Sequence, residues 1–380
     1  MSRTQMTSRE RILTTIRHEE PDRVPISPRV GAWMVAQYGQ GGLAKELEVL
    51  PDMDFMYIIG EPGRNYIYSL PEQYDLPGVE VEQTRREDGD TYIIERTFRT
   101  PAGEISDVTR VPPAGREYGV SPNPVKLEHL IKSRDDLDAV RAILPPPSLR
   151  ADTLRAYEQQ VGDRGVIMVC VRSALDHNAG DARGMQNLMV DYYADRALFD
   201  EILALFHQHS LEHTRAALEA GAQFIFGSWY HNSLSSGWSP AIFEEVFVPQ
   251  IRDHVELTHS YGALYDYYDD GKLARSMELI VGCGVDVLET CTPPPVGDFD
   301  LAEAKRTIGP ITTIKGYVDL LYVVKHGTPE LVERRVREAM EIAKPGGGFI
   351  IGSSDSFREG TPRENIETYF RACKQYGVYG

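Results

Sequence analysis

The sequence has few cysteines and no long apolar run. Cys170, Cys283, Cys291 and Cys373 are scattered over 380 residues and form no CxxC pair. So few cysteines in so long a chain exclude a disulfide framework, and we expect a reducing, cytoplasmic location. No stretch approaches the roughly 20 apolar residues of a membrane-spanning helix. The first 20 residues are charged and lack the apolar core of a secretory signal, so we expect no membrane partner.

Positive charge is also scarce. The chain has 40 basic against 57 acidic side chains and a net charge of −17. Nonspecific binding to nucleic acid or to an anionic membrane needs a positive field, so both are excluded as partners. A small anionic substrate is not excluded, because a local arginine can reverse the field inside one pocket. With 42% hydrophobic and 26% charged residues the composition is that of a globular protein. We therefore expect a soluble enzyme that acts on a small molecule.

Short apolar runs alternate with amphipathic stretches along most of the chain. The predicted strands are Val24–Ser27, Met53–Gly60, Val166–Val171, Ala222–Gly227, Ala263–Tyr268, Val285–Glu289, Ile311–Gly316 and Gly348–Ser353. Eight such strands with helices between them predict a (β/α)8 TIM barrel, and we expect a single domain over residues 1–380. The competing fold is a doubly wound open sheet. It is disfavoured because no strand is followed by a GxGxxG or GxxxxGK[ST] motif.

Residues 79–111 have a different pattern. Three segments there alternate apolar and polar side chains and are separated by EDGD and PAG turns. This pattern is typical of an antiparallel β meander with one solvated face. We expect the meander to be an insertion in the barrel that either covers its mouth or forms the contact of a homodimer.

In a (β/α)8 barrel the active site lies at the carboxyl ends of the strands. The side chains expected there are Arg29, Trp33, Arg172, His177, Tyr230, His231, Tyr267, Tyr268, Asp270, Glu289 and Asp355, with Asp54 in the second strand segment. Polar residues also follow strands as ordinary turns and helix caps. His207, His209 and His213 share one helix, where HxxxH spacing can bind a metal, but without partners in the sequence a solvated face is favoured.

Four blocks of the sequence resemble the uroporphyrinogen decarboxylase superfamily, which includes corrinoid-dependent methyltransferases. The blocks span Arg9–Arg29, Ala220–Pro249, Gly282–Gly309 and residues 345–380. The resemblance covers most of the chain and implies a (β/α)8 barrel, in agreement with the strand count.

The superfamily contains two chemistries, and the sequence departs from the motifs of both. Decarboxylases carry an RQAGRY-type motif whose arginines hold the carboxylates of a porphyrinogen, whereas PRVGAWM here leaves only Arg29. Their acidic residue after the second strand is matched by Asp54. Zinc-dependent methyltransferases carry His-x-Cys-Gly after the fifth strand and a later cysteine, where this chain has Tyr268, Asp270 and Asp355.

The resemblance therefore implies an oxygen-rich metal site made of Asp270, Glu289 and Asp355. Carboxylates favour zinc less than thiolates do and admit harder divalent ions. Alternatively no metal binds and the carboxylates carry out acid–base chemistry.

The leading functional hypothesis is methyl transfer from a methoxyaromatic or methylamine-type substrate to a corrinoid protein, with cobalamin as the methyl acceptor. In this hypothesis His231 and Tyr268 are catalytic. The substrate is held by Arg29, Trp33, Arg172, His177, Tyr230 and Tyr267. One alternative is decarboxylation of a tetrapyrrole or a related heteroaromatic acid, with Asp54 stabilising the ring. The other is a noncatalytic binding protein on an enzyme scaffold.

Overall fold

The computed structural model describes residues 5–113 and 123–380, which divide into two compact units. The first, here called the barrel unit, comprises Met1–Gly60, Arg150–Cys170 and Ala217–Gly380. The second, here called the sheet unit, comprises Glu61–Leu149 and Val171–Ala216.

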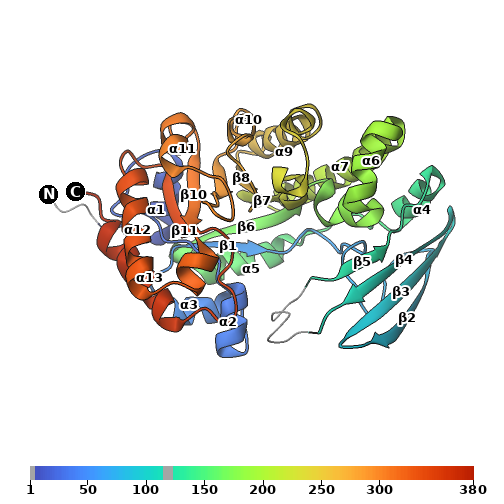
Figure 1. Ribbon diagram of the computed structural model, residues 1–380, viewed down its shortest axis with the longest axis horizontal. Helices are drawn as coiled ribbons and strands as arrows, with labels where there is room; N and C mark the ends of the chain where they lie inside the picture. Colours follow the sequence, from blue (N-terminus) through green and yellow to red (C-terminus); the bar gives the residue numbers. More distant parts are fainter. Residues whose placement is uncertain (1–4, 114–122) are drawn as a thin grey trace. The chain divides into compact units, whose positions relative to one another are not determined.

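A seven-stranded sheet forms the centre of the barrel unit (Figure 1). Its strands, in spatial order, are β1 (Phe55–Ile59), β6 (Gly165–Arg172), β7 (Phe224–Ser228), β8 (Leu264–Tyr268), β9 (Val287–Thr290), β10 (Thr313–Val318) and β11 (Phe349–Ser353). Strand β1 pairs with β6, and β7 to β11 pair in succession, all in parallel. Spatial order follows chain order, as successive βα units require.

The segment predicted as the first strand connects the two edges of this sheet. Ile26 forms a parallel bridge with Ile351 of β11, and the Ser27 amide donates to the Ile351 carbonyl at 2.9 Å. On the other side the Asp54 amide, just before β1, donates to the Ile26 carbonyl at 2.8 Å. All eight predicted strand positions are therefore present, and the predicted TIM-barrel type of fold is confirmed.

Helices alternate with the strands of the barrel unit, as predicted, and α1 precedes them all. Their bounds are α1 (Ser8–Ile16), α2 (Gly31–Tyr38), α3 (Leu43–Val49), α5 (Ala151–Val161), α8 (Pro240–Ile242), α9 (Val248–Ser260), α10 (Met277–Val281), α11 (Leu301–Thr307), α12 (Pro329–Ala343) and α13 (Arg363–Tyr376). Helix α12 shows why they begin where they do. The Thr328 hydroxyl accepts from the Leu331 amide, and Pro329 occupies the first turn, where its missing N–H costs nothing.

The sheet unit contains the predicted meander. Strands β2 (Glu80–Asp88), β3 (Thr91–Thr100), β4 (Gly103–Val111) and β5 (Val125–Glu128) pair antiparallel in that order, which confirms the β insertion. Its helices are α4 (Leu137–Ala142), α6 (Met185–Ala194) and α7 (Arg196–Glu219), with a π-helical segment over Leu175–Gly184. Strand β3 buries Ile93, Ile94 and Phe98, whereas β2 is almost wholly solvated.

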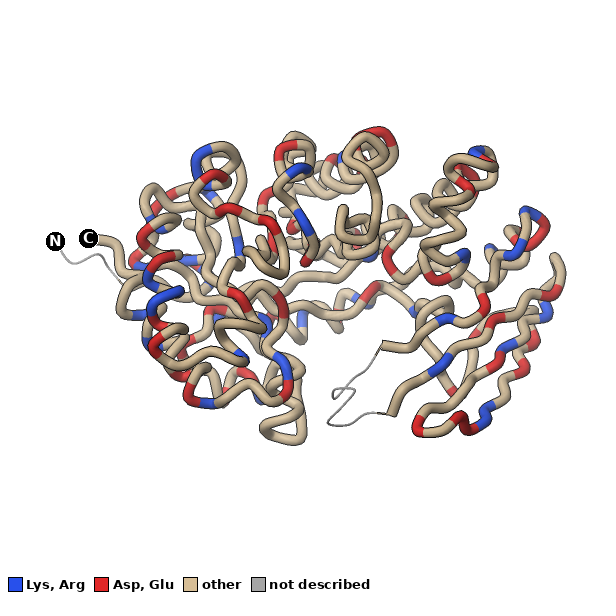
Figure 2. Tube along the Cα trace, viewed as in Figure 1, with Lys and Arg blue, Asp and Glu red and all other residues tan. Residues whose placement is uncertain are grey.

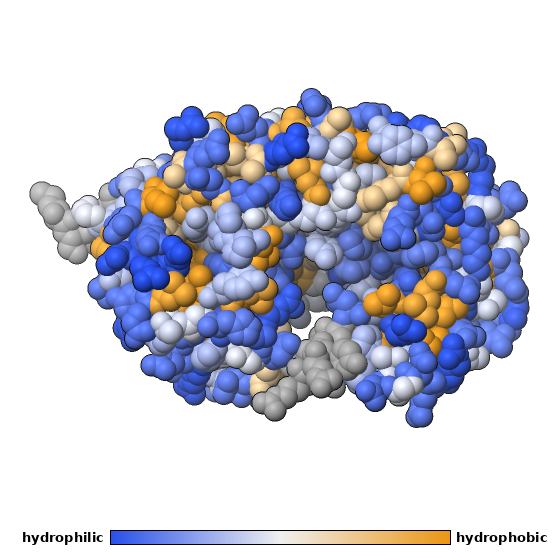
Figure 3. Space-filling view, viewed as in Figure 1, coloured by the Kyte–Doolittle hydropathy of each residue, from blue (hydrophilic) through white to orange (hydrophobic). Residues whose placement is uncertain are grey.

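The charged residues are distributed over both units. Figure 2 shows acidic and basic residues interspersed along the helices of the barrel unit and along β2 to β4. On the meander, Arg99 pairs with Glu82 and Glu104, each at 3.0 Å. Hydrophilic residues cover most of the face seen in Figure 3. None of the described helices combines the length and apolar character that a membrane crossing requires. Few of the described acidic side chains are buried, so most of the acidic excess lies at the solvated surface.

Candidate functional site

Four charged or phenolic side chains meet at the carboxyl ends of the barrel strands. Arg29 follows the Val24–Ser27 segment, and its Nη2 lies 3.2 Å from Oδ1 of Asp355, which follows β11. The Arg29 guanidinium also lies over the Tyr268 ring, 4.3 Å from its centroid. Tyr268 ends β8, and its hydroxyl donates to Oδ2 of Asp270 at 3.2 Å. We call Arg29, Tyr268, Asp270 and Asp355 the strand-end cluster.

The two carboxylates of the strand-end cluster, Asp270 and Asp355, differ in how well nearby positive charges neutralise them. Burial, together with the negative charge of Asp355, raises the pKa of Asp270 to about 6, although Arg29 acts in the opposite direction. Asp355 is better compensated, because it pairs with both Arg29 and Arg358 and accepts from the Ser356 amide at 2.6 Å. Asp270 is therefore the group in the cluster that exchanges a proton near neutral pH.

A second set of charges lies just inside the strands, because parallel register brings it together. Tyr268, Glu289 and Lys315 are register partners on β8, β9 and β10. The Lys315 ammonium lies 2.6 Å from Oε2 of Glu289, and both side chains are almost fully buried. Burial raises the pKa of Asp266 well above its usual value, and the negative Glu289 adds to the rise. Burial is the largest single influence on Glu289 and opposes its ionisation, but Lys315, Arg29 and a hydrogen bond with Asp266 together lower its pKa below the usual value. The opposite directions of the two pKa shifts favour a protonated Asp266 beside an ionised Glu289.

The predicted metal ligands do not form a metal site in this arrangement. Among the described residues, Asp270, Glu289 and Asp355 do not bring three ligand atoms within 4.8 Å of one another. Glu289 is neutralised by Lys315, and Asp355 by Arg29 and Arg358. A divalent ion would have to displace these cations, so the trio does not fit a metal. Their environment in this structure favours acid–base and charge-pairing roles for the three residues over the predicted metal-ligand role.

Asp54, predicted to be catalytic, lies at the opposite end of the barrel. It directly precedes β1 and is fully buried. Its Oδ1 and Oδ2 each lie 2.6 Å from a guanidinium, those of Arg11 and Arg23, and Oδ2 also accepts from the Ile26 amide at 2.7 Å. A carboxylate at the amino end of a strand, closed in by two arginines, cannot reach a substrate at the carboxyl end. This position favours a structural role for Asp54 over the predicted catalytic one.

Three of the aromatic residues predicted to hold substrate have different environments. Tyr267 is fully buried and stacks on Trp229, with ring centroids 5.6 Å apart, so it cannot contact a substrate. Trp33 is 3% exposed and lines a cavity of about 450 Å³ between α2 and α13, to which no member of the strand-end cluster contributes. Tyr230 is 43% exposed and follows β7 beside His231, at 5.1 Å between ring centroids. Tyr230 and His231 thus remain accessible candidates in the barrel unit.

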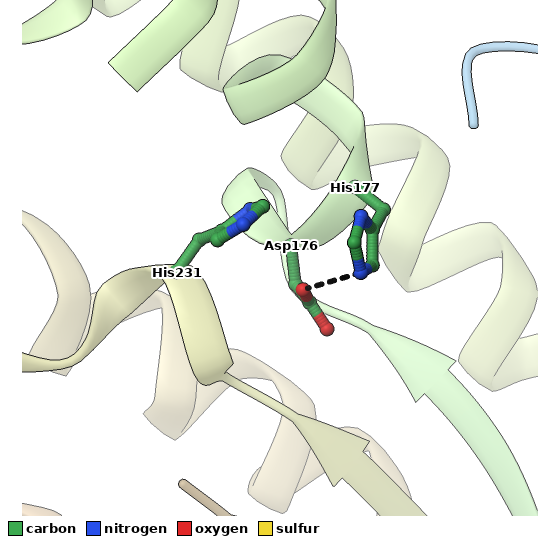
Figure 4. A group of neighbouring side chains, drawn as sticks. All are labelled: Asp176, His177 and His231. Carbon is green, nitrogen blue, oxygen red and sulfur yellow. Dashed lines mark ion pairs between the residues drawn. The ribbon is translucent and has the colours of Figure 1, made fainter. Parts of the chain in front are cut away.

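Arg172 and His177 belong to a polar group in the sheet unit. Arg172 pairs with Glu61 at 2.8 Å. Figure 4 shows His177 beside Asp176, with 3.8 Å between Nε2 and Oδ1; His231, also drawn there, belongs to the barrel unit. Nδ1 of His177 lies 3.2 Å from Oδ2 of Asp181. His177 has a φ of 52°, a conformation that residues other than glycine rarely adopt.

From the sequence, Asp266 and Lys315 were expected among the polar residues at the strand ends but were given no role, and Arg358 was not identified. Asp266 and Lys315 are charged residues inside strands that are otherwise apolar, and that contrast is the available signal. Arg358 lies in a polar loop of ordinary composition and gave no signal. Their importance depends on partners in other strands.

Over much of its length the chain is similar in sequence to uroporphyrinogen decarboxylases. Residues 118–376 match the family model described as uroporphyrinogen decarboxylase (URO-D). The chloroplastic uroporphyrinogen decarboxylase of Nicotiana tabacum is 25% identical over 257 residues, which are 64% of this chain and 62% of that protein. The uroporphyrinogen decarboxylase of Crocosphaera subtropica is 24% identical, covering 96% of this chain and 95% of that protein.

Two methanogen proteins are also similar. The methylated-thiol–coenzyme M methyltransferase of Methanosarcina mazei is 30% identical over 105 residues, or 28% of this chain and 26% of that protein. Among solved structures, a methyltransferase from Methanosarcina mazei aligns with a TM-score of 0.64 and 15% identity, covering 98% of this chain and 99% of that one. At this identity the structural match establishes the common fold alone.

Proposed function

Because the chain belongs to the uroporphyrinogen decarboxylase family, we propose that it is a methyltransferase that moves a methyl group from a small methylated substrate to a corrinoid protein. The observation that carries the proposal is the strand-end cluster. It has one carboxyl group, Asp270, with a pKa of about 6, and one partly exposed arginine, Arg29, already paired with Asp355. A substrate with many carboxylates would need several free arginines, and Arg11 and Arg23 are engaged with Asp54 at the other end.

Under this proposal, the chemical role of the chain is to protonate the leaving group. The bond between the methyl carbon and the oxygen or nitrogen of the substrate breaks, and the reduced corrinoid of the partner supplies the electron pair that receives the methyl group. The electron pair of the broken bond stays on the leaving oxygen or nitrogen. Asp270 donates a proton there, since a group with a pKa near the working pH is an efficient general acid.

The other residues of the barrel unit orient the substrate and maintain the protonation state of Asp270. Tyr268 donates its hydroxyl hydrogen bond to Asp270, and Arg29 stacks on the Tyr268 ring, so the carboxyl group is held in one position. Tyr230 and His231 follow β7 and are assigned to the substrate side of the site. Arg29 binds a substrate carboxylate only if that group displaces Asp355. These roles require no metal, in agreement with the poor fit of the carboxylates to one.

The test mixes the purified chain with methoxylated aromatics or methylamines and cob(I)alamin, and follows the absorbance of methylcobalamin. We expect turnover with one donor class and a loss of about 100-fold in kcat for Asp270→Asn, which cannot donate the proton. Glu303→Gln, an exposed acid on α11, is the matched control and should keep the wild-type rate. Absence of turnover with every donor contradicts the proposal.

Decarboxylation is the second candidate, favoured by the match to a named decarboxylase over almost the whole chain. Its predicted ring-stabilising residue, Asp54, is buried at the wrong end of the barrel. Arg29 would then be the cation available in the strand-end cluster for a carboxylate substrate. Release of carbon dioxide from uroporphyrinogen, measured in the same preparation, would establish this function instead.

A further inference from the structure

Two histidines of α7 converge on one point in the sheet unit. His209 and His213 are one helical turn apart, so their side chains lie on the same face. Their Nε2 atoms are 3.0 Å apart. The rings are inclined at 66° with centroids 4.4 Å apart, so the two Nε2 atoms lie closer than the rings do. The sequence favoured a solvated face for this helix, and the structure corrects that interpretation.

The surroundings of the pair differ from those of a solvated face. His213 is 4% exposed, and among the described residues its Nδ1 has no hydrogen-bond partner. His209 lines a cavity of about 600 Å³ in the sheet unit. Burial lowers the pKa of His209 to about 4 and that of His213 to about 3. Both rings are thus neutral at pH 7, and their Nε2 atoms share a hydrogen bond in which one of them is the donor. An ion that binds both Nε2 atoms requires this proton to move to Nδ1 of the same ring, which leaves a lone pair on each Nε2.

The cavity beside His209 contains an acidic group without a cationic partner among the described residues. Arg134 pairs with Glu201 at 2.8 Å, and Arg141 pairs with Asp138 at 2.9 Å, so these cavity charges cancel. Glu212 also lines the cavity, and its carboxylate accepts from the neutral amide of Gln208 at 3.0 Å. It therefore leaves a net negative charge next to the histidine pair.

We propose that His209 and His213 chelate one divalent transition-metal ion at the edge of this cavity. Two imidazole nitrogens that each lie about 2.1 Å from an ion, as in protein metal sites, and 3.0 Å from each other subtend an angle of about 90° at the ion. That angle is the one between neighbouring ligands in octahedral or square-planar coordination, which Ni²⁺ and Cu²⁺ adopt with nitrogen and oxygen ligands. Water or a small anionic ligand in the cavity fills the other positions. The site is independent of the proposed methyl transfer.

The test is titration of the full-length protein with Ni²⁺ by isothermal calorimetry. We expect one ion per chain to be bound by the pair, and His209→Ala to weaken this binding about tenfold or more. His207→Ala is the matched control. It lies on the same helix, but two residues from His209 and so on a different face, and it should bind like the wild type.

A second measurement separates metal binding from folding. Ni²⁺ should raise the thermal unfolding midpoint of the wild type and of His207→Ala, because an ion that binds the folded state stabilises it. Ni²⁺ should raise the thermal unfolding midpoints of His209→Ala and His213→Gln much less. Since His209 borders the cavity, His209→Ala should keep the wild-type circular dichroism spectrum. Wild-type Ni²⁺ affinity in a folded His209→Ala protein would overturn the proposal.

Discussion

The two ends of the barrel strands differ in how their carboxylates are paired. At the amino end Asp54 is paired with both Arg11 and Arg23 and accepts from a backbone amide, and Arg11 also pairs with Asp22 at 2.7 Å. At the carboxyl end Arg29 and Arg358 pair with Asp355, and burial together with the charge of Asp355 raises the pKa of Asp270 to about 6. A fully paired acid is a fixed charge that joins segments, whereas crowded acids give a proton that can be exchanged. We therefore assign a role in stability to the amino end and, under the proposed function, proton exchange to the carboxyl end.

The largest expected effect is at the amino end. Asp54→Ala should lower the free energy of unfolding in urea by about 3–5 kcal/mol, because it leaves Arg11 and Arg23 without their shared buried partner. Asp52→Ala is the control two residues away. Asp52 pairs with Lys374 at the surface, so its loss should cost less than about 1 kcal/mol. If the folded Asp54→Ala protein has a reduced specific activity, the amino end also contributes to activity, and the distinction between the two ends is wrong.

The next effect concerns the charges just inside the carboxyl end. Lys315→Met should lower the free energy of unfolding by about 3 kcal/mol, since it leaves the buried Glu289 without its nearest cation. The loss should be smaller than for Asp54→Ala because Arg29 also favours ionised Glu289. Adding Glu289→Gln removes the charge that needs a partner, so the double variant should recover part of the loss. Strictly additive losses in this cycle would contradict the pairing.

Asp270→Asn should raise the free energy of unfolding at pH 7, whereas Asp54→Ala should lower it. The pKa of Asp270 in the folded protein, about 6, is above the ordinary value of 3.8, so the native state binds its proton more tightly than the unfolded state does. Its contribution to stability therefore falls as pH rises from about 4 to about 6 and stays low at pH 7. The variant should remove this fall and be more stable at pH 7 by up to about 2 kcal/mol. Urea unfolding between pH 4 and pH 7.5 measures this pH dependence of the free energy of unfolding. If the variant and the wild type depend on pH equally, the raised pKa of Asp270 is contradicted.

The smallest effect separates two adjacent tyrosines. Tyr267→Phe should change the free energy of unfolding by less than about 1 kcal/mol and leave activity unaltered, because the buried Tyr267 hydroxyl has no hydrogen-bond partner among the described residues. Tyr268→Phe is the matched comparison and removes the hydrogen bond that lowers the pKa of Asp270. We expect it to move the pH dependence of kcat to higher pH. Equal pH profiles for both variants would contradict the proposed role of Tyr268.

The order of elements was predictable from the sequence because hydrophobic periodicity and turn residues act over short distances. Strand β8 was expected over Ala263–Tyr268 and is observed over Leu264–Tyr268. The meander was expected over residues 79–111, and its first three strands occupy residues 80–111. The prediction that polar residues at the carboxyl ends of the strands form the site also identified Tyr268, Asp270 and Asp355. Asp54 lies one residue before β1, at the amino end of the predicted strand Met53–Gly60, and its predicted catalytic role came from the family resemblance rather than from this position.

The sequence by itself determined that this chain has a TIM-barrel type of fold with a β insertion, and that polar residues follow the strands. Only the tertiary structure decided which charges meet. Arg29 and Asp355 are 326 residues apart, and Arg11 reaches Asp54 across 43. Whether a carboxylate is a fixed charge or an exchangeable acid depends on its distance to such partners and on its burial. Both are set by the packing of distant segments, which local sequence patterns do not encode.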